Sequence, residues 1–135
     1  MRVMIDTNIL FSALLFPKSV PAKALLHLAQ NRSCVLCDYV IDEFRRITFA
    51  KRPDLLGDAD ALIAELSAEI VIAPREPSKL ISDPKDAPIL NAAILYETDA
   101  ILSGDKHFKN LALEYPRVMT ATEYLEFEQS ETSSF

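Results

Sequence analysis

The stretch Arg2-Val3-Met4-Ile5-Asp6-Thr7-Asn8 decides the fold, because a short apolar run leads directly into polar residues that suit the start of a helix. Such a run predicts a strand buried on both faces, as in parallel sheets. An apolar helical pattern follows through Phe11 and Leu14. Asp6, which ends the strand, lies where open parallel sheets bind ligands, but an Asp also suits the cap of the next helix. Both interpretations of Asp6 stay open.

The same alternation of apolar runs and helical patterns continues along the chain. Further strands are predicted at Cys34–Leu36, Ile70–Ile72, Ala100–Leu102 and Val118–Met119. Helices are expected at about 21–30, 38–50 with Asp38 as cap, 58–68 with Asp58 as cap, 86–97, and after the capping box Thr120-x-x-Glu123. This alternation predicts an α/β fold with a parallel central sheet. We expect one domain over 1–128 and a polar, frayed tail at 129–135.

Composition narrows the class of protein. The chain has 135 residues, half of them hydrophobic, which is enough for one domain with its own core. Its apolar runs are too short for a bilayer and its start lacks the pattern of a secretory signal, so we expect a soluble cytoplasmic protein with no membrane partner. Only two glycines occur, where average usage would give about nine. This scarcity argues against the glycine-rich loops of nucleotide and dinucleotide sites.

The net charge and the two cysteines bear on the function but do not determine it. The net charge of -6 weakens a nucleic-acid interpretation but does not exclude it, because bound metal would neutralise part of it. Cys34 and Cys37 form a C-x-x-C, but a spacing of three on a strand puts the two side chains on opposite faces. No second cysteine pair completes a zinc site, so we expect two buried, reduced thiols.

A second acidic residue, Glu43, shares the apolar side of its helix. Val40, Phe44 and Ile47 form the predicted stripe, and Glu43 lies three residues after the first and four before the last. A carboxylate on a buried face needs a partner, which can be a basic side chain or a metal ion.

Two more acids follow later in the chain. Asp86 heads the inward stripe of its helix, although a helix cap is an equally good explanation and Asp83 competes for the same role. Asp105 follows the fourth strand as Asp6 follows the first, and Ser103 could bond a neighbouring carboxylate. An ordinary turn is the alternative for Asp105.

If the fold gathers these four acids, they repel one another. Two unit charges about 4 Å apart cost roughly 4 kcal/mol at an effective dielectric near 20. One or two divalent ions bound through oxygen would offset that repulsion, and such ions activate water and stabilise charge on a phosphate. The set of acids therefore predicts metal-dependent phosphoester hydrolysis.

The chain also resembles the PIN-domain ribonucleases, close to the VapC-like toxins of toxin–antitoxin systems. The segments that carry the resemblance are Met4-Ile5-Asp6-Thr7-Asn8, Asp83-Pro84-Lys85-Asp86-Ala87-Pro88-Ile89-Leu90 and Leu102-Ser103-Gly104-Asp105-Lys106. The resemblance implies a three-layer α/β/α sandwich and a Mg²⁺ or Mn²⁺ site. Its implied metal ligands are Asp6, Glu43, Asp86 and Asp105, with Asn8, Ser103 and Asp83 beside them. His107 stands where many members carry a further acid.

The activity implied is endonucleolytic cleavage of single-stranded RNA, with Arg45, Arg46 and Lys106 as candidate contacts to the phosphate backbone. The implied partners are a small antitoxin protein and a second copy of the chain in a homodimer. The alternative is a catalytically silent PIN-like module that binds RNA or protein. A phosphoacceptor receiver domain is a third class, but Thr7 follows Asp6 where such a domain needs paired acids.

Overall fold

A central parallel sheet organises the chain. The computed structural model describes residues 1–74, 87–104 and 116–133. Within them the sheet has five strands in the order β3-β2-β1-β4-β5, and all four pairings are parallel. The strands are β1 (Arg2–Ile5), β2 (Ser33–Cys37), β3 (Glu69–Val71), β4 (Ala100–Leu102) and β5 (Arg117–Met119). The predicted strands differ from these by no more than one residue at either end, so the α/β prediction is confirmed.

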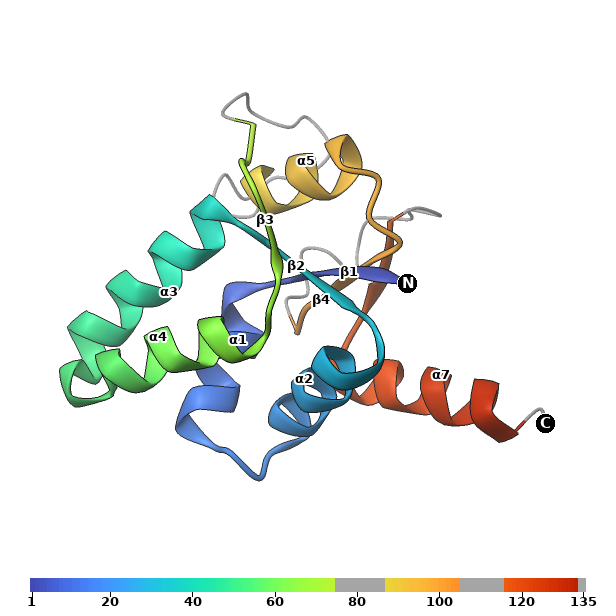
Figure 1. Cartoon of the computed structure of the whole chain (residues 1–135), viewed down its shortest axis with the longest axis horizontal. Coiled ribbons are helices and arrows are strands. Elements are labelled where there is room, and N and C mark those ends of the chain that lie inside the picture. Colours follow the sequence, from blue (N-terminus) through green and yellow to red (C-terminus); the bar gives the residue numbers. More distant parts are fainter. Residues whose placement is uncertain (75–86, 105–115, 134–135) are drawn as a thin grey trace.

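Helices cover both faces of this sheet. Figure 1 shows α5 on one side of the sheet and α2 and α7 on the other. Because β–helix–β connections are right-handed, the reversal of strand order after β3 puts α5 on the face opposite α1 to α4. The described helices are α1 (Thr7–Leu15), α2 (Val20–Asn31), α3 (Asp38–Lys51), the 3-10 turn η1 (Pro53–Leu55), α4 (Leu56–Glu65), α5 (Ala87–Leu95) and α7 (Ala121–Ser133). The three-layer sandwich is therefore present.

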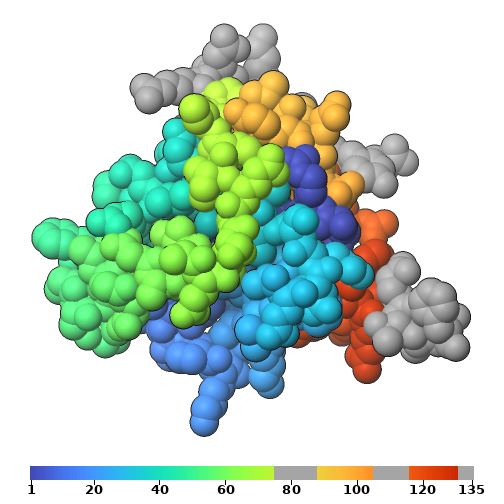
Figure 2. Space-filling model, viewed as in Figure 1, coloured from blue at the N-terminus to red at the C-terminus, as the bar shows by residue number. Residues whose placement is uncertain are grey.

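The core is centred on β1 and β4. Val3, Met4 and Ile5 are fully buried, as are the three residues of β4. This explains why both strands are apolar runs without polar alternation, which is the pattern of strands covered on both faces. Figure 2 shows α3 and α4 as one continuous lobe beside this centre.

Several helix boundaries differ from the sequence prediction. Cys37, not Asp38, is the cap residue of α3, and Asp38 is the first helical residue. The Asp38 Oδ1 atom instead accepts the backbone N–H groups of Tyr39 at 2.9 Å and Ala73 at 2.8 Å, which ties the start of α3 to the segment after β3. Asp58 does not cap α4 either, because η1 leads into the helix and α4 begins at Leu56.

The last helix begins as predicted and continues further. The Thr120 hydroxyl accepts the Glu123 N–H at 3.1 Å, and the Glu123 carboxylate accepts the Thr120 N–H at 3.0 Å. This reciprocal pair is the predicted capping box. The helix then runs to Ser133, so it includes residues 129–133 of the expected tail.

Polar contacts hold α7 against α2. The Arg32 guanidinium donates to both oxygens of the Glu128 carboxylate, at 3.0 and 2.6 Å. One turn away, His27 Nδ1 lies 2.8 Å from the Tyr124 hydroxyl. Tyr124 is fully buried, and desolvation raises the pKa of its phenol well above the usual value. These contacts give His27 a structural place between α2 and α7.

The two cysteines are buried and free of disulfides, as predicted. Burial raises the pKa of each thiol from 9.0 to about 11. Among the described helices none is long and apolar enough to cross a membrane alone; α1 and α2 together pass that test by length and composition, with a bend of 110° between them.

Candidate functional site at the carboxyl edge of the sheet

The strand order creates one switch point in the sheet. From β1 the chain moves outward through β2 to β3, and then it returns to the other side of β1 to form β4 and β5. Ligands of open α/β sheets bind outside the carboxyl ends of the strands at such a reversal. Asp6 directly follows β1, and Ser103 directly follows β4. Both residues therefore lie at the crevice between the two halves of the sheet.

Asp6 is held from three sides. Its side chain and backbone are only 2% exposed. The Oδ1 atom accepts the Thr7 N–H at 2.7 Å, and the Oδ2 atom accepts the Ser103 hydroxyl at 2.7 Å. The Asp6 N–H donates to the Leu102 carbonyl at 3.0 Å. Asp6 thus caps α1 and also forms part of a polar group with β4, so the two interpretations of this residue are compatible.

Thr7 is a polar residue of this region that the sequence argument did not single out. It is 1% exposed, and within the described part of the chain its hydroxyl is the one buried side-chain polar atom without a hydrogen-bond partner. An unsatisfied buried hydroxyl costs about 1–3 kcal/mol. Its place directly after Asp6 at the end of β1 was the one signal in the sequence.

Glu43 lies half-buried on α3, which packs against α1. The Tyr39 hydroxyl, one turn earlier, donates weakly to Glu43 Oε2 at 3.4 Å. The buried stripe of this helix is formed by Val40, Phe44 and Thr48, not Ile47. Thr48 is tolerated there because its hydroxyl donates to the Phe44 carbonyl at 2.8 Å. Glu43 is therefore beside the buried stripe, with its carboxylate at the boundary.

The other predicted ligands lie outside the described residues. These ligands are Asp86 and Asp105. Asp83, the candidate RNA contact Lys106 and His107 also lie outside the described residues. In residues 1–74, 87–104 and 116–133, no three His, Cys, Asp or Glu side chains are grouped closely enough to hold a metal ion. The donors that are described, Asp6 and Glu43, are carboxylates, which are the hard oxygen ligands that Mg²⁺ and Mn²⁺ prefer. The orphaned Thr7 hydroxyl beside Asp6 also fits a site that takes an additional polar group.

The residues expected around the metal ligands differ in their hydrogen bonds and ion pairs. Ser103 bonds Asp6 directly, whereas Asn8 is exposed and its side chain has no hydrogen bond to any described residue. Arg45 pairs with Asp60, and Arg46 pairs with Asp42 at 3.1 Å. All four charged groups are exposed, and exposed pairs contribute little stability. These two arginines can therefore exchange their partners for a phosphate at low cost.

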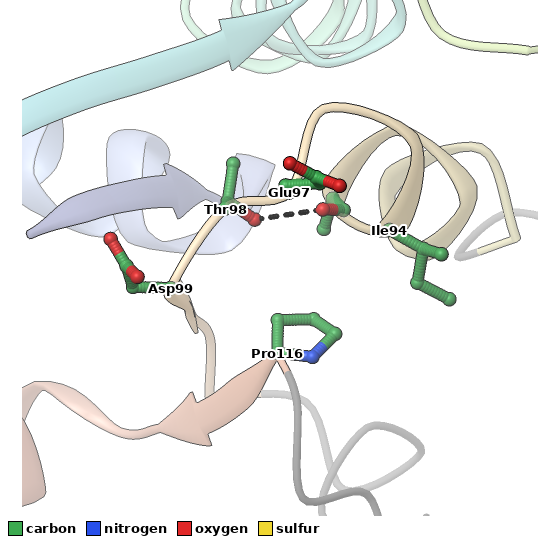
Figure 3. Close-up of a pocket in the computed structure, with 6 residues that line it drawn as sticks. Ile94, Glu97, Thr98, Asp99 and Pro116 are labelled. Atoms are coloured by element: carbon green, nitrogen blue, oxygen red, sulfur yellow. Dashed lines mark hydrogen bonds between the residues drawn. The ribbon is translucent and has the colours of Figure 1, made fainter.

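Two cavities lie at opposite edges of the sheet. One, of about 490 Å³, is at the carboxyl edge and is lined by Asp38, Tyr39, Asp42, Ala73, Pro74 and Pro88. The other, of about 240 Å³, is at the amino edge of β4 and β5. Figure 3 shows residues that line this second cavity, among them Thr98, whose hydroxyl donates to the Ala93 carbonyl at 3.1 Å. Only the larger cavity is on the same edge as Asp6.

Comparison with known proteins agrees with this architecture. A complex named VapBC2 from Rickettsia felis, bound to a DNA fragment from its promoter, contains a chain with a similar fold, with a TM-score of 0.68 and 17% sequence identity. The match covers 89% of this chain and 98% of that chain. No curated protein matches the sequence. The family model of the PIN domain matches residues 2–107. The chain therefore belongs to the PIN domain family, whose members are generally nucleases.

Proposed function

We propose that the protein is a metal-dependent endoribonuclease that hydrolyses phosphodiester bonds of single-stranded RNA. The observation that carries the proposal is Asp6, a buried carboxylate at the switch point that accepts the Ser103 hydroxyl. Burying a carboxylate is costly, and the bonds from the Thr7 N–H and the Ser103 hydroxyl offset part of that cost. A buried carboxylate held in this way at the ligand-binding edge of the sheet favours a functional role. Membership in the PIN domain family supports nuclease chemistry.

The proposal assigns a role to each candidate site residue. Asp6 and Glu43 would hold Mg²⁺ or Mn²⁺, with Asp86 and Asp105 as the further proposed ligands. The bound ion would activate a water and neutralise charge on the phosphate oxygens. Ser103, by donating to Asp6 Oδ2, fixes the direction of the carboxylate. Arg45, Arg46 and Lys106 are the proposed contacts to the RNA backbone.

The proposed biological role is that of the toxin of a toxin–antitoxin pair acting in the cytoplasm. The similar fold in the VapBC2 complex supports a small antitoxin protein as partner. A homodimer is the proposed oligomeric state, which sedimentation of the purified protein can measure.

The proposal is tested by cleavage of a labelled single-stranded RNA. The protein should cleave with Mn²⁺ or Mg²⁺ and lose activity in EDTA. Asp6→Asn should reduce cleavage to background while circular dichroism and the melting temperature show a folded protein. The matched control is Asp58→Asn, which removes an exposed acid from the first turn of α4 and should cleave like the original protein.

Cleavage that persists in EDTA, or full activity of Asp6→Asn, would overturn the proposal. A protein that binds RNA or an antitoxin but takes up no Mn²⁺ in calorimetry, and cleaves nothing, would instead be the catalytically silent module.

A further inference from the structure

The larger cavity is built around the start of α3. Tyr39 and Asp42 come from the first turn and a half of this helix, and Ala73 and Pro74 follow β3. Asp38 joins the two parts through its bonds to the N–H groups of Tyr39 and Ala73. The cavity wall is therefore braced by hydrogen bonds within the described chain. A volume of about 490 Å³ lies inside the range of roughly 300–1,000 Å³ typical of small-ligand sites.

Tyr39 connects this cavity to the proposed catalytic residues. Its ring is half-buried and lines the cavity, while its hydroxyl lies 3.4 Å from Glu43 Oε2. A ligand that contacts the ring is thus one side chain away from Glu43. An RNA bound beside Glu43 would therefore lie within reach of this cavity.

The residues that line the cavity suit the base of a nucleotide better than its phosphate. An aromatic ring, two prolines and an alanine offer flat and apolar surface, which suits a base stacked on the ring. Asp38 brings a carboxylate without a basic partner among the described residues, which disfavours a phosphate there, whereas the charge of Asp42 is offset by its pair with Arg46. Carboxylate oxygens accept hydrogen bonds, so they favour a base that presents N–H donors.

The Asp38 carboxylate has an oxygen to offer for such a bond. Its Oδ1 atom accepts both backbone N–H groups, and its Oδ2 atom has no partner among the residues described. Guanine presents two adjacent N–H donors on one edge, which match the two oxygens of a carboxylate, or one oxygen each of two carboxylates. Uracil presents one.

We propose that this cavity is a nucleobase subsite, in which one base of the RNA stacks on Tyr39 and is read by the carboxylates of Asp38 and Asp42, with guanine preferred over uracil. This subsite rests on the proposed ribonuclease function. It assigns Tyr39 as a substrate-contacting residue and makes the cleavage dependent on the base placed beside the scissile bond.

The first test is binding of mononucleotides to the full chain, which needs no cleavage. Titration with GMP should shift the NMR signals of Tyr39 and Ala73, and UMP should bind more weakly. Tyr39→Leu should lose about tenfold in GMP affinity, because it removes the stacking surface. Tyr39→Phe keeps the ring and should keep the affinity. Phe49→Leu is the matched control, since it removes an exposed aromatic ring from the same helix outside the cavity.

The second test is cleavage of RNAs that differ in one base beside the cut. Tyr39→Leu should raise KM about tenfold and flatten the preference among bases, while Tyr39→Phe keeps the preference. Unchanged GMP affinity and unchanged base preference in Tyr39→Leu would overturn the subsite even if the protein is a ribonuclease. GMP binding at Tyr39 without any RNA cleavage would leave the subsite standing and refute the ribonuclease function instead.

Discussion

Among single residues, Ser103 has the clearest testable role. Its hydroxyl is buried and donates to the buried carboxylate of Asp6 at 2.7 Å. Ser103→Ala removes one hydrogen bond to a charged group, so we expect a loss of about 1.5–3 kcal/mol in the free energy of unfolding. Substituting a residue that orients a metal ligand typically lowers metal affinity by about 10–100-fold. The Mn²⁺ affinity of Ser103→Ala, measured by calorimetry, should therefore fall by at least about tenfold.

Ser103→Thr is the control for this prediction, because it retains the hydroxyl. It should keep most of the Mn²⁺ affinity. Equal affinities for the alanine and threonine variants would show that the hydroxyl does not position Asp6.

The arginines of α3 permit a second prediction at this scale. If Arg45 contacts a phosphate, Arg45→Gln should weaken RNA binding for every sequence and reduce the slope of log affinity against log salt by about 0.7. The measurement is fluorescence polarisation over a salt series, using Asp6→Asn to prevent cleavage. Lys23→Gln removes an equal charge from an exposed position on α2 and should leave the slope unchanged. The same slope for both variants would exclude Arg45 from the RNA contact.

Among the elements, α7 depends on one ion pair. Glu128 is 6% exposed at its side chain, and its partner Arg32 is 35% exposed. Removing one partner of a fully buried pair costs about 3–5 kcal/mol, and the partial exposure of Arg32 lowers this cost. Glu128→Gln should therefore reduce the free energy of unfolding by about 2 kcal/mol in urea denaturation. Glu126→Gln, at an exposed position of the same helix, should change it by less than about 0.5 kcal/mol.

The helices and strands also show which parts of the fold could be predicted from the sequence. The strands were predictable because β1 and β4 are buried on both faces, which leaves an uninterrupted apolar run. The capping box at Thr120 was predictable because both of its bonds are local. Asp38 was misjudged as a cap because its second bond reaches Ala73, 35 residues away. No local pattern reports such a contact.

The candidate site also has features that the sequence predicts and features that depend on the folded chain. The position of Asp6 follows from strand-end geometry, which the sequence predicts directly. The bond to Ser103 depends on β1 and β4 being neighbours, and strand order is a property of the whole sheet. Thr7 was missed because the lack of a partner for its hydroxyl follows from the packing around it, which the sequence does not report. The pair of Arg45 with Asp60 likewise depends on how α3 packs against α4, whereas the pair of Arg46 with Asp42 has the i,i+4 spacing that a helical sequence already indicates.

At the scale of the whole molecule, alkaline pH should weaken the fold. The thiols of Cys34 and Cys37 have a pKa of about 11 in the folded chain against 9.0 as the ordinary value. The unfolded chain therefore releases these protons first, so the contribution of the two thiols to stability is constant below about pH 9 and is lost between about pH 9 and 11. Each thiol should contribute roughly 2–3 kcal/mol to that fall. The raised pKa of Tyr124 adds to the fall above pH 10.

The measurement is urea denaturation at a series of pH values, followed by circular dichroism. A variant with Cys34→Ala and Cys37→Ala should be less stable at neutral pH but should show a shallower fall above pH 9. An equally steep fall in that variant would assign the alkaline transition to other groups.

The strand that precedes Asp6 is synthesised before the other four strands but lies in the middle of the sheet, between β2 and β4. A nascent chain emerging from the ribosome cannot complete this arrangement early, because the Asp6–Ser103 bond spans 97 positions of sequence. At synthesis rates of roughly 5–20 residues per second, several seconds separate the two partners. For the proposed ribonuclease, the delay means that the chain must be synthesised through β4 before Asp6 can take up its place in the site.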